Sequence, residues 1–245
     1  MNSFYISGAG APGEIVRLLP EEARHACQVL RLRAGEAICA VDEAGRRFEA
    51  EIAEISRDAC AARLIAELPS NEPELRVTLY QGLPKSDKLD LIVQKLTELG
   101  AARVVPVKMD RCVVRLDARD GEKRRARLEK IAREAAKQCR RARAPQIEAP
   151  RSWREIEEDL RAHELLLVPW EDEHALGLKQ ARDQNERVRD LGVVIGPEGG
   201  MGGEEVEYLR KLGAQTVTLG PRILRTETAA VAACALSMLL WGDVG

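Results

Sequence analysis

The sequence is poor in the residues on which several classes of site depend. Aromatic side chains make up 3% of the 245 positions, which argues against a sheet of base-stacking Phe and Tyr of the RRM type. The histidines (His25, His163 and His174) are dispersed, and the six cysteines include no C-x-x-C pair. We therefore expect neither a disulfide framework nor a zinc site, and we predict no metal.

Long apolar runs are also missing. The longest uncharged stretch, Thr228–Trp241, is shorter than the roughly 18 apolar residues that a membrane-spanning helix needs. The N-terminus has no basic segment leading into an apolar core. We therefore expect a soluble, cytoplasmic protein with no membrane partner. With 45% hydrophobic and 32% charged residues, the chain can bury a core in one large domain or two smaller ones.

An excess of charge of either sign is absent from the whole chain. The 38 Lys and Arg against 40 Asp and Glu give a net charge of -2, which taken alone argues against nucleic-acid binding. The balance differs by segment: residues 103–143 carry 15 basic and 6 acidic side chains, whereas residues 148–190 carry 7 basic and 12 acidic ones. This segregation indicates a polyanionic partner bound by one face.

The first 70 residues, which contain no lysine, have the pattern of a small, mostly β domain. Strands are predicted over 4–7, 37–41, 47–55 and 60–68, with a short helix over 20–30. The following segment, Pro69–Pro73, combines two prolines with polar residues and is typical of a linker. We therefore place one domain at 1–70 and a second at 74–245.

Beyond the linker, strands and helices alternate. Strands are predicted over 76–81, 103–107, 164–168, 193–195 and 216–219. Between and after them we expect a helix capped by Ser86 and closed by Gly100, a second over 122–143, a third from Gly203 to Gly213, and a last over 228–241. This alternation predicts an α/β domain with a parallel sheet covered by helices on both faces. The last helix is apolar nearly all round, so we expect it to be buried in the domain or in a dimer interface.

Three of the predicted strands end in unusual segments: Pro169-Trp170, Gly196–Gly200 and Gly220–Arg225. Ligands of open α/β sheets bind beyond the carboxyl ends of the strands. The Gly196–Gly200 run could expose backbone N–H groups to a ligand, or it could simply form a tight turn. It does not fit a phosphate loop, because acids stand where that motif requires a lysine and a hydroxyl. A pocket of backbone and apolar side chains suits adenosine with a sulfonium side chain better than a triphosphate.

Three ordered motifs resemble the RsmE family of 16S rRNA uracil-N3 methyltransferases. They are Gln94–Gly100, Gly196–Gly200 and Leu219–Ala229. His25 with Val29-Leu30-Arg31 and Gly35 is similar to that family's opening domain. Two positions depart from the family pattern: Met201 stands where Phe or Leu is frequent, and Lys137 where Glu is usual.

The resemblance implies an N-terminal PUA-like β-barrel that aids RNA binding and a C-terminal SPOUT methyltransferase domain, which is a parallel-sheet domain threaded into a trefoil knot. It implies a homodimer that uses S-adenosylmethionine to methylate N3 of a uridine in 16S rRNA, either naked or in the assembled small ribosomal subunit. The cofactor-binding residues that it implies are Leu167, Val168, Pro169, Gly196, Pro197, Glu198, Gly199, Gly200, Leu219, Gly220, Ile223, Leu224, Arg225 and Thr226.

Uridine N3 holds its proton at neutral pH, so methyl transfer needs a base or stabilisation of the anion. Arg225, and with it Arg222, could bind the uracil oxygens or a nearby phosphate. Glu227 is a candidate base or the group that orients Arg225; the alternative is an acid favoured by the dipole at the start of the last helix. Glu198 fits a loop-fixing residue better than an acid catalyst.

Basic residues of segment 103–143 recur at a spacing that could form one stripe on a helix. A solvated face is the alternative, but the excess of positive charge favours rRNA phosphates. The residues predicted to bind RNA are His25, Arg31, Arg127, Lys130, Arg133, Lys137, Arg141 and Arg222. For His25, a packed position on the predicted helix is an equal alternative. Three other functions stay open: a SPOUT enzyme with another RNA target, a noncatalytic rRNA-binding assembly factor, and a cysteine hydrolase using Cys139. The last is disfavoured because no His lies in a comparable motif.

Overall fold

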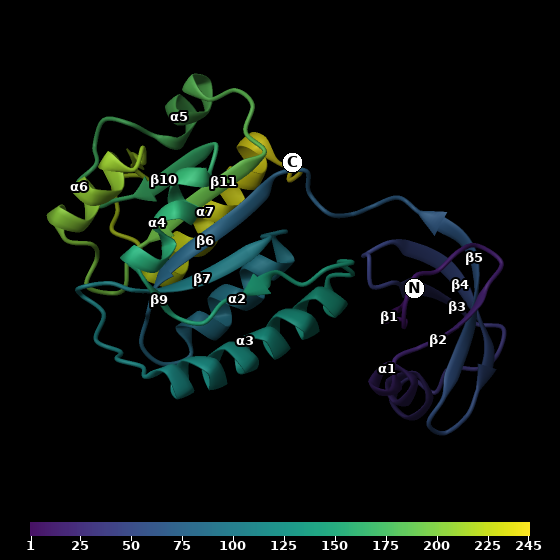
Figure 1. The fold of residues 1–245 in the computed structure, drawn as a ribbon. Helices are drawn as coiled ribbons and strands as arrows, with labels where there is room; N and C mark the ends of the chain where they lie inside the picture. Colours follow the sequence, from purple (N-terminus) through teal and green to yellow (C-terminus); the bar gives the residue numbers. More distant parts are fainter. The chain divides into compact units, whose positions relative to one another are not determined.

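The computed structural model describes all 245 residues, which form two compact units. Unit 1 comprises Met1–Glu72 together with Ala136–Arg143, and unit 2 comprises Pro73–Ala135 and Ala144–Gly245 (Figure 1). The sequence gives no sign that a short segment from the middle of the chain belongs to the first unit. No helix of the chain combines the length and apolar character needed to cross a membrane.

Unit 1 is built on a five-stranded sheet in the order β1-β3-β4-β5-β2. An antiparallel bridge between Ile6 and Leu18, and a hydrogen bond from Leu19 N to Tyr5 O (3.0 Å), join the ends of the two outer strands. The sheet therefore closes on itself around a core that includes Phe4 and Phe48, as expected for a PUA-like barrel. The strands are β1 (Ser3–Tyr5), β2 (Ile15–Arg17), β3 (Ala37–Val41), β4 (Arg47–Ile55) and β5 (Cys60–Leu68).

The predicted strands 37–41, 47–55 and 60–68 are confirmed with these bounds, and the helix predicted over 20–30 consists of two pieces. α1 (Pro20–Arg24) is followed by the π-helical turn η1 (His25–Val29). The chain then leaves the helix at Arg31, whose φ of +54° no right-handed helix can adopt. His25 and Arg31 are both exposed on this irregular segment.

Unit 2 contains a sheet of seven strands in which every pairing is parallel. Its order is β12-β10-β11-β6-β7-β8, with β9 also paired to β7. The five predicted strands are all present, whereas β8 and β9 are too short to be predicted. The trefoil knot stays a prediction. The strands are β6 (Arg76–Gly82), β7 (Arg103–Lys108), β8 (Gln146–Ile147), β9 (Arg151–Ser152), β10 (Leu165–Pro169), β11 (Asp190–Ile195) and β12 (Gln215–Val217).

Helices cover both faces of this sheet, with α4 and α7 on opposite faces (Figure 1). The apolar helix α7 packs against α2, β6 and β11, and it buries Ala230, Ala233 and Met238. The helix expected to be buried is therefore part of the core of unit 2. The helices are α2 (Lys88–Glu98), α3 (Ala118–Gln138), α4 (Trp153–Ala162), α5 (Leu178–Gln184), α6 (Gly203–Lys211) and α7 (Thr226–Trp241).

Several predicted helix ends are wrong. Asp87, not Ser86, is the N-cap of α2, because Ser86 has a φ of +55°. The helix predicted over 122–143 begins earlier and ends at Gln138, and the φ of +62° at Arg140 prevents its continuation. Helices α4 and α5 were not predicted. The capping box of α4, in which Ser152 N donates to Glu155 Oε2 (2.7 Å), is the signal that could have revealed it.

Candidate active site

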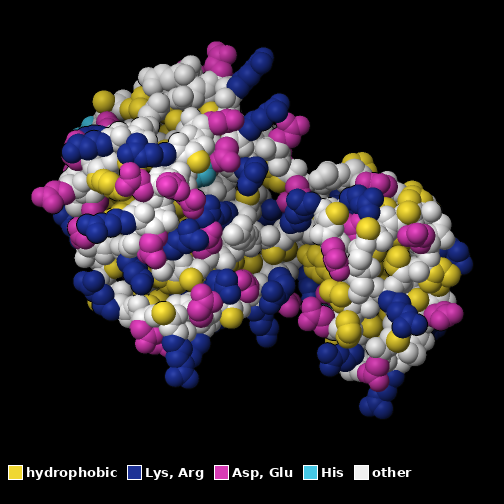
Figure 2. Space-filling model, viewed as in Figure 1, with side chains coloured by type: hydrophobic (Ala, Val, Ile, Leu, Met, Phe, Trp, Pro, Cys, Tyr) yellow, Lys and Arg dark blue, Asp and Glu magenta, His cyan; other side chains and the backbone are white.

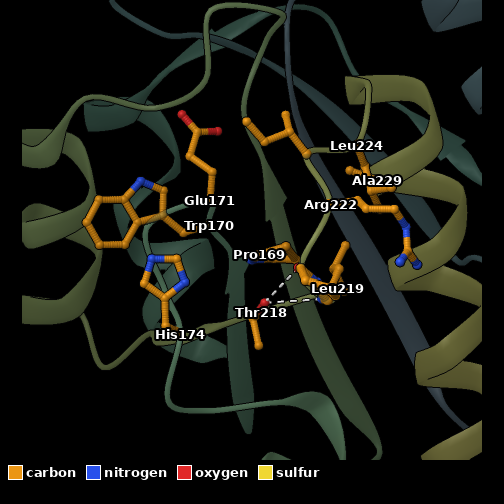
Figure 3. A pocket seen from close by; sticks show the side chains of 12 residues that line it. Pro169, Trp170, Glu171, His174, Thr218, Leu219, Arg222, Leu224 and Ala229 are labelled. Carbon is orange, nitrogen blue, oxygen red and sulfur yellow. Dashed lines mark hydrogen bonds between the residues drawn. The ribbon is translucent and has the colours of Figure 1, made fainter.

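Two adjoining cavities open at the carboxyl ends of β10, β11 and β12, where the sequence predicts a ligand site. The first, of about 260 Å³, is lined by residues 169–171, His174, 218–224 and Ala229 (Figure 3). The second, of about 360 Å³, is lined by Lys88 and by residues from the loops after the three strands. The two cavities share six lining residues: Pro169, Trp170, Glu171, Ile223, Leu224 and Ala229.

Most of the predicted cofactor residues line one of these cavities. Leu167 and Val168 do not, because they are buried inside β10 in the core of unit 2. Gly199 faces away from both cavities toward Arg111, whose Nη1 donates to Gly199 O (3.0 Å). The residues that do line a cavity are Pro169, Gly196, Pro197, Glu198, Gly200, Leu219, Gly220, Ile223, Leu224, Arg225 and Thr226.

The buried side chain of Gln81, at the end of β6, ties two of the loops together. Its Nε2 donates to Thr226 Oγ1 (2.9 Å) and to Gly196 O (3.3 Å), and Thr226 Oγ1 in turn donates to Gly196 O (2.6 Å). The start of α7 is thereby held against the loop that follows β11. Gln81 is not among the predicted site residues, because β6 also contains Arg76 and Thr78 and the polarity of Gln81 therefore does not single it out.

Two glycines are required at the site, Gly82 by a close approach of the backbone and Gly200 by its positive φ. A Cβ on Gly82 would lie 2.6 Å from the backbone nitrogen of Pro197, so only glycine allows β6 to meet this loop. Gly200 has a φ of +69°, and a Cβ there would lie 2.7 Å from Oε1 of Glu171. The Glu171 carboxylate thus lies beside the loop and lines both cavities, which the sequence analysis did not predict.

A single ammonium group links two carboxylates at the edge of the second cavity. Lys88 Nζ lies 3.0 Å from Glu198 Oε1 and 3.3 Å from Glu227 Oε2. Glu198 Oε1 also accepts a hydrogen bond from Lys85 N (3.0 Å). Burial would raise the pKa of Glu198, but hydrogen bonds from the backbone and Lys88 hold that pKa below its ordinary value. The hydrogen bond to Glu198 raises the pKa of Lys88 in turn, so both groups stay charged near neutral pH. These contacts are those of a loop-fixing glutamate.

Comparison with known proteins places this geometry in a family. The RNA methyltransferase domain model matches residues 71–238, and the RNA methyltransferase PUA domain model matches residues 18–65. The ribosomal RNA small subunit methyltransferase E (RsmE) of Bacillus subtilis is 36% identical over 215 residues, covering 85% of this chain and 84% of the relative. This chain belongs to the RsmE family. The corresponding protein of Mycobacterium tuberculosis is 31% identical over 236 residues, covering 94% of this chain and 88% of its own.

Solved structures of similar proteins agree with the RsmE assignment. An RsmE of Neisseria gonorrhoeae bound to S-adenosyl methionine is 32% identical, has a TM-score of 0.85, and is covered over 100% of both chains. A Legionella pneumophila methyltransferase in complex with the same cofactor is 29% identical, with a TM-score of 0.84 and 98% coverage of each chain. The fold is the SPOUT methyltransferase fold preceded by a PUA-like domain.

The three residues predicted to act on the substrate do not share one cavity in this RsmE family member. Arg225 is exposed at the N-cap of α7 and lines the second cavity. Arg222 is exposed and lines the first. Glu227 lines neither cavity but a groove between α2 and α7, and its ion-pair partner is Lys88. The expected pairing of Glu227 with Arg225 is therefore not found.

The predicted basic stripe does not form one surface. On the face in Figure 2, Lys and Arg project along the edge where α3 lies, with Asp and Glu between them. Lys130 and Arg133 are exposed on α3 and have no acidic partner within 4.0 Å. Arg127 instead pairs with Asp87 and Asp90.

The last two members of the stripe belong to unit 1. Lys137 Nζ lies 2.6 Å from the buried carboxylate of Glu22. Arg141 lies beyond the end of α3, is buried, and pairs with Glu72 (2.6 Å). The interpretation of Arg141 as part of a helical RNA-binding stripe is therefore wrong, because its charge is already neutralised inside unit 1. Cys139 lies in the same segment and lines neither of these two cavities, so the ligand site at the strand ends does not support the hydrolase alternative.

Proposed function

We propose that this chain is an S-adenosylmethionine-dependent methyltransferase that modifies N3 of a uridine in 16S rRNA, acting in the cytoplasm. The observation that carries the proposal is the meeting of three predicted loops around two adjoining cavities in a chain of the RsmE family. We assign RNA binding to the domain at 1–70 and methyl transfer to the domain at 74–245.

The residues around the cavities fit S-adenosylmethionine. Leu219, Ile223 and Leu224 offer apolar surface to an adenine ring, and the nearby backbone of Gly220 can approach it closely. The carboxylate of Glu171 lies where it can bind ribose hydroxyls or a positive charge. When bound, the cofactor supplies a methyl group on a positively charged sulfur.

We assign the target uracil to the second cavity. Its rim carries Lys88 and Arg225, whose positive charges can face the uracil oxygens as N3 loses its proton. Since a paired base cannot present N3, the target uridine must be unpaired or flipped out of its stack. Arg222, which lines the first cavity, would bind a flanking phosphate.

The proposed RNA contacts outside the cavities are exposed basic groups without an ion-pair partner. Lys130 and Arg133 on α3 meet this description in unit 2, and His25 and Arg31 meet it on the irregular segment of unit 1. Such groups bind phosphates without reading sequence. The whole small ribosomal subunit or its naked rRNA would offer the same phosphate chemistry.

A homodimer is part of the proposal. Leu236 and Leu239 on α7 are 37% and 55% exposed, and Leu91 on α2 is 44% exposed. The groove between these helices is lined by further apolar residues, among them Val231 and Ala235. An exposed apolar surface of this kind is what an isologous dimer interface would cover.

Mass spectrometry of rRNA nucleosides tests the function directly. A strain that lacks the gene should lose N3-methyluridine from 16S rRNA, and the purified protein with S-adenosylmethionine should restore it. Retained N3-methyluridine would refute the target. Calorimetry with S-adenosylhomocysteine separates an enzyme from a noncatalytic assembly factor, for which no binding is expected.

Arg225→Ala tests the assignment of the second cavity. Removing one group that stabilises developing charge should lower kcat by about 100-fold while S-adenosylhomocysteine binding stays within about twofold. An unchanged kcat would remove Arg225 from the substrate site. Lys179→Ala on α5, which lines neither cavity, is the matched control and should retain full activity.

A further inference from the structure

Lys88 and Glu227 form an ion pair at the second cavity but differ in their access to it. Lys88 lines the cavity, whereas Glu227 does not. Oε2 of Glu227 is inaccessible to solvent and faces the Lys88 ammonium at 3.3 Å. Lys88 therefore borders the space in which a substrate would lie, whereas Glu227 contacts Lys88 and does not line that space.

The Lys88 ammonium has at least one N–H donor that is not directed to its two carboxylate partners. An ammonium group has three N–H donors and no acceptor. Its two ion-pair partners, Glu198 Oε1 at 3.0 Å and Glu227 Oε2 at 3.3 Å, can occupy at most two of the three. The side chain is 29% exposed, and its exposed part belongs to the wall of the second cavity.

We propose that Lys88 is a catalytic residue whose third ammonium N–H donates to a carbonyl oxygen of the target uracil, with Glu198 and Glu227 as positioning residues that hold the ammonium in place. This inference rests on the proposed function and states how Lys88, at the rim of the second cavity, acts on the substrate and what holds it there. Two carboxylates, one on a loop and one on α7, fix the ammonium more tightly than one could, and electrostatic stabilisation depends on such fixed charges.

The chemistry balances with Lys88 charged throughout. The N3 proton leaves to solvent water, and the negative charge spreads to the two uracil carbonyl oxygens. The nitrogen electron pair forms the new N–C bond, the S–C bond breaks, and its electrons remain on the sulfur, which becomes neutral. The Lys88 ammonium stabilises the anion between these events and gives up no proton.

The other charged groups near Lys88 are few. Glu198 comes from the loop after β11 and Glu227 from the first turn of α7. Arg225 and Glu171 line the same cavity. On its own helix, Asp87 and Asp90 are paired with Arg127. Lys88 and Arg225 are therefore the two cations available to a uracil anion there.

The test compares Lys88→Met with Lys88→Arg and with the control Lys211→Met, at the exposed end of α6. We expect Lys88→Met to lower kcat by about 100-fold, as for loss of one donor to a developing oxyanion. Lys88→Arg should recover part of that loss, and Lys211→Met should match the wild type. Binding of S-adenosylhomocysteine to all three, measured by calorimetry, should stay within about threefold and shows that each variant is folded.

Two further readouts distinguish this role from a structural one. In Lys88→Met the rate should keep rising with pH beyond the point at which the wild-type rate levels off, because without the ammonium the N3 anion is less stable and forms only at higher pH. On 16S rRNA transcribed with 5-fluorouridine, whose N3 is more acidic, the deficit of Lys88→Met should shrink at least tenfold.

Each remaining outcome has one meaning. A Lys88→Met deficit that is equal on both RNAs, with an unaltered pH profile or with lost S-adenosylhomocysteine binding, would show a structural role and overturn the inference. A fully active Lys88→Met would do the same. If the wild type itself transferred no methyl group to N3 of either RNA, the proposed function would fail first, and this inference with it.

Discussion

Arg141 and the pair Lys130 and Arg133 belong to one basic segment but should respond in opposite ways to loss of charge. Arg141 is buried and paired with Glu72 inside unit 1, whereas Lys130 and Arg133 are exposed and unpaired. We therefore predict that Arg141→Met changes stability and leaves the electrostatics of RNA binding intact. The double variant Lys130→Ala/Arg133→Ala should do the reverse.

The size of the first effect follows from burial. The Arg141 and Glu72 side chains are 8% and 19% exposed, with Nη2 and Oε2 2.6 Å apart. Removing one partner of a buried ion pair costs about 3–5 kcal/mol. Glu72 would keep a hydrogen bond from Arg143 N (3.1 Å) and some water. We therefore expect Arg141→Met to lower the free energy of unfolding by about 2–3 kcal/mol.

The second effect follows from counterion release. Each phosphate contact to single-stranded nucleic acid contributes about 0.7 to the slope of log K against log salt concentration. Losing Lys130 and Arg133 should reduce the steepness of that slope by about 1.4. Substitutions of exposed side chains usually change stability by no more than about 0.5 kcal/mol.

Urea denaturation and RNA binding between 50 and 200 mM salt measure both quantities on the same preparations. Unfolding should be followed with probes for each unit, because two units need not unfold together. An Arg141→Met protein of unchanged stability but reduced salt slope would refute our interpretation of the basic segment. So would a double variant that keeps the wild-type slope.

Two other predictions concern buried polar groups. Gln81→Leu removes the donor to Thr226 and Gly196. We expect it to lower the free energy of unfolding by about 1–2 kcal/mol and to weaken S-adenosylhomocysteine binding measured by calorimetry. Unchanged binding would show that the loops hold their positions without Gln81. In unit 1, burial of Asp42 would raise its pKa, but hydrogen bonds from Arg46 and Gly10 lower that pKa overall. The ionised Asp42 therefore stabilises unit 1 at pH values above its unfolded-state pKa of about 3.9, and this stabilisation is lost as the pH falls through the lower pKa of the folded state. The free energy of unfolding of Asp42→Asn should depend less on pH in the acid range than that of the wild type. Identical acid unfolding transitions of the two proteins would contradict this.

The strands and the location of the site could be predicted because they depend on local patterns. Alternation along 47–55 places Phe48 and Ile52 in the core of unit 1, and the apolar runs of unit 2 form its central parallel strands. The chemical oddity of three strand ends was enough to locate the cavities, because the carboxyl ends of parallel strands meet at one edge.

What could not be predicted depends on contacts between distant residues. Nothing near Arg141 in the sequence shows that Glu72 neutralises it, and nothing near Lys88 shows that it holds Glu227. Helix ends failed where single residues adopt positive φ, as at Ser86 and Arg140, because propensities alone do not identify such positions. Gln81 was missed because its partners lie 115 and 145 residues away.

The inclusion of residues 136–143 in unit 1 has a consequence for the order of events during synthesis. Domains generally fold from the N-terminus as the chain emerges from the ribosome, but this unit lacks Arg141 and Ala142 until more than half of the chain has been made. Until then the sheet of unit 1 cannot complete its packing, because Glu72 is unpaired and the surface of Cys39 and Val41 is uncovered. The second cavity of unit 2 can form only later, once Thr226 and the start of α7 have been translated.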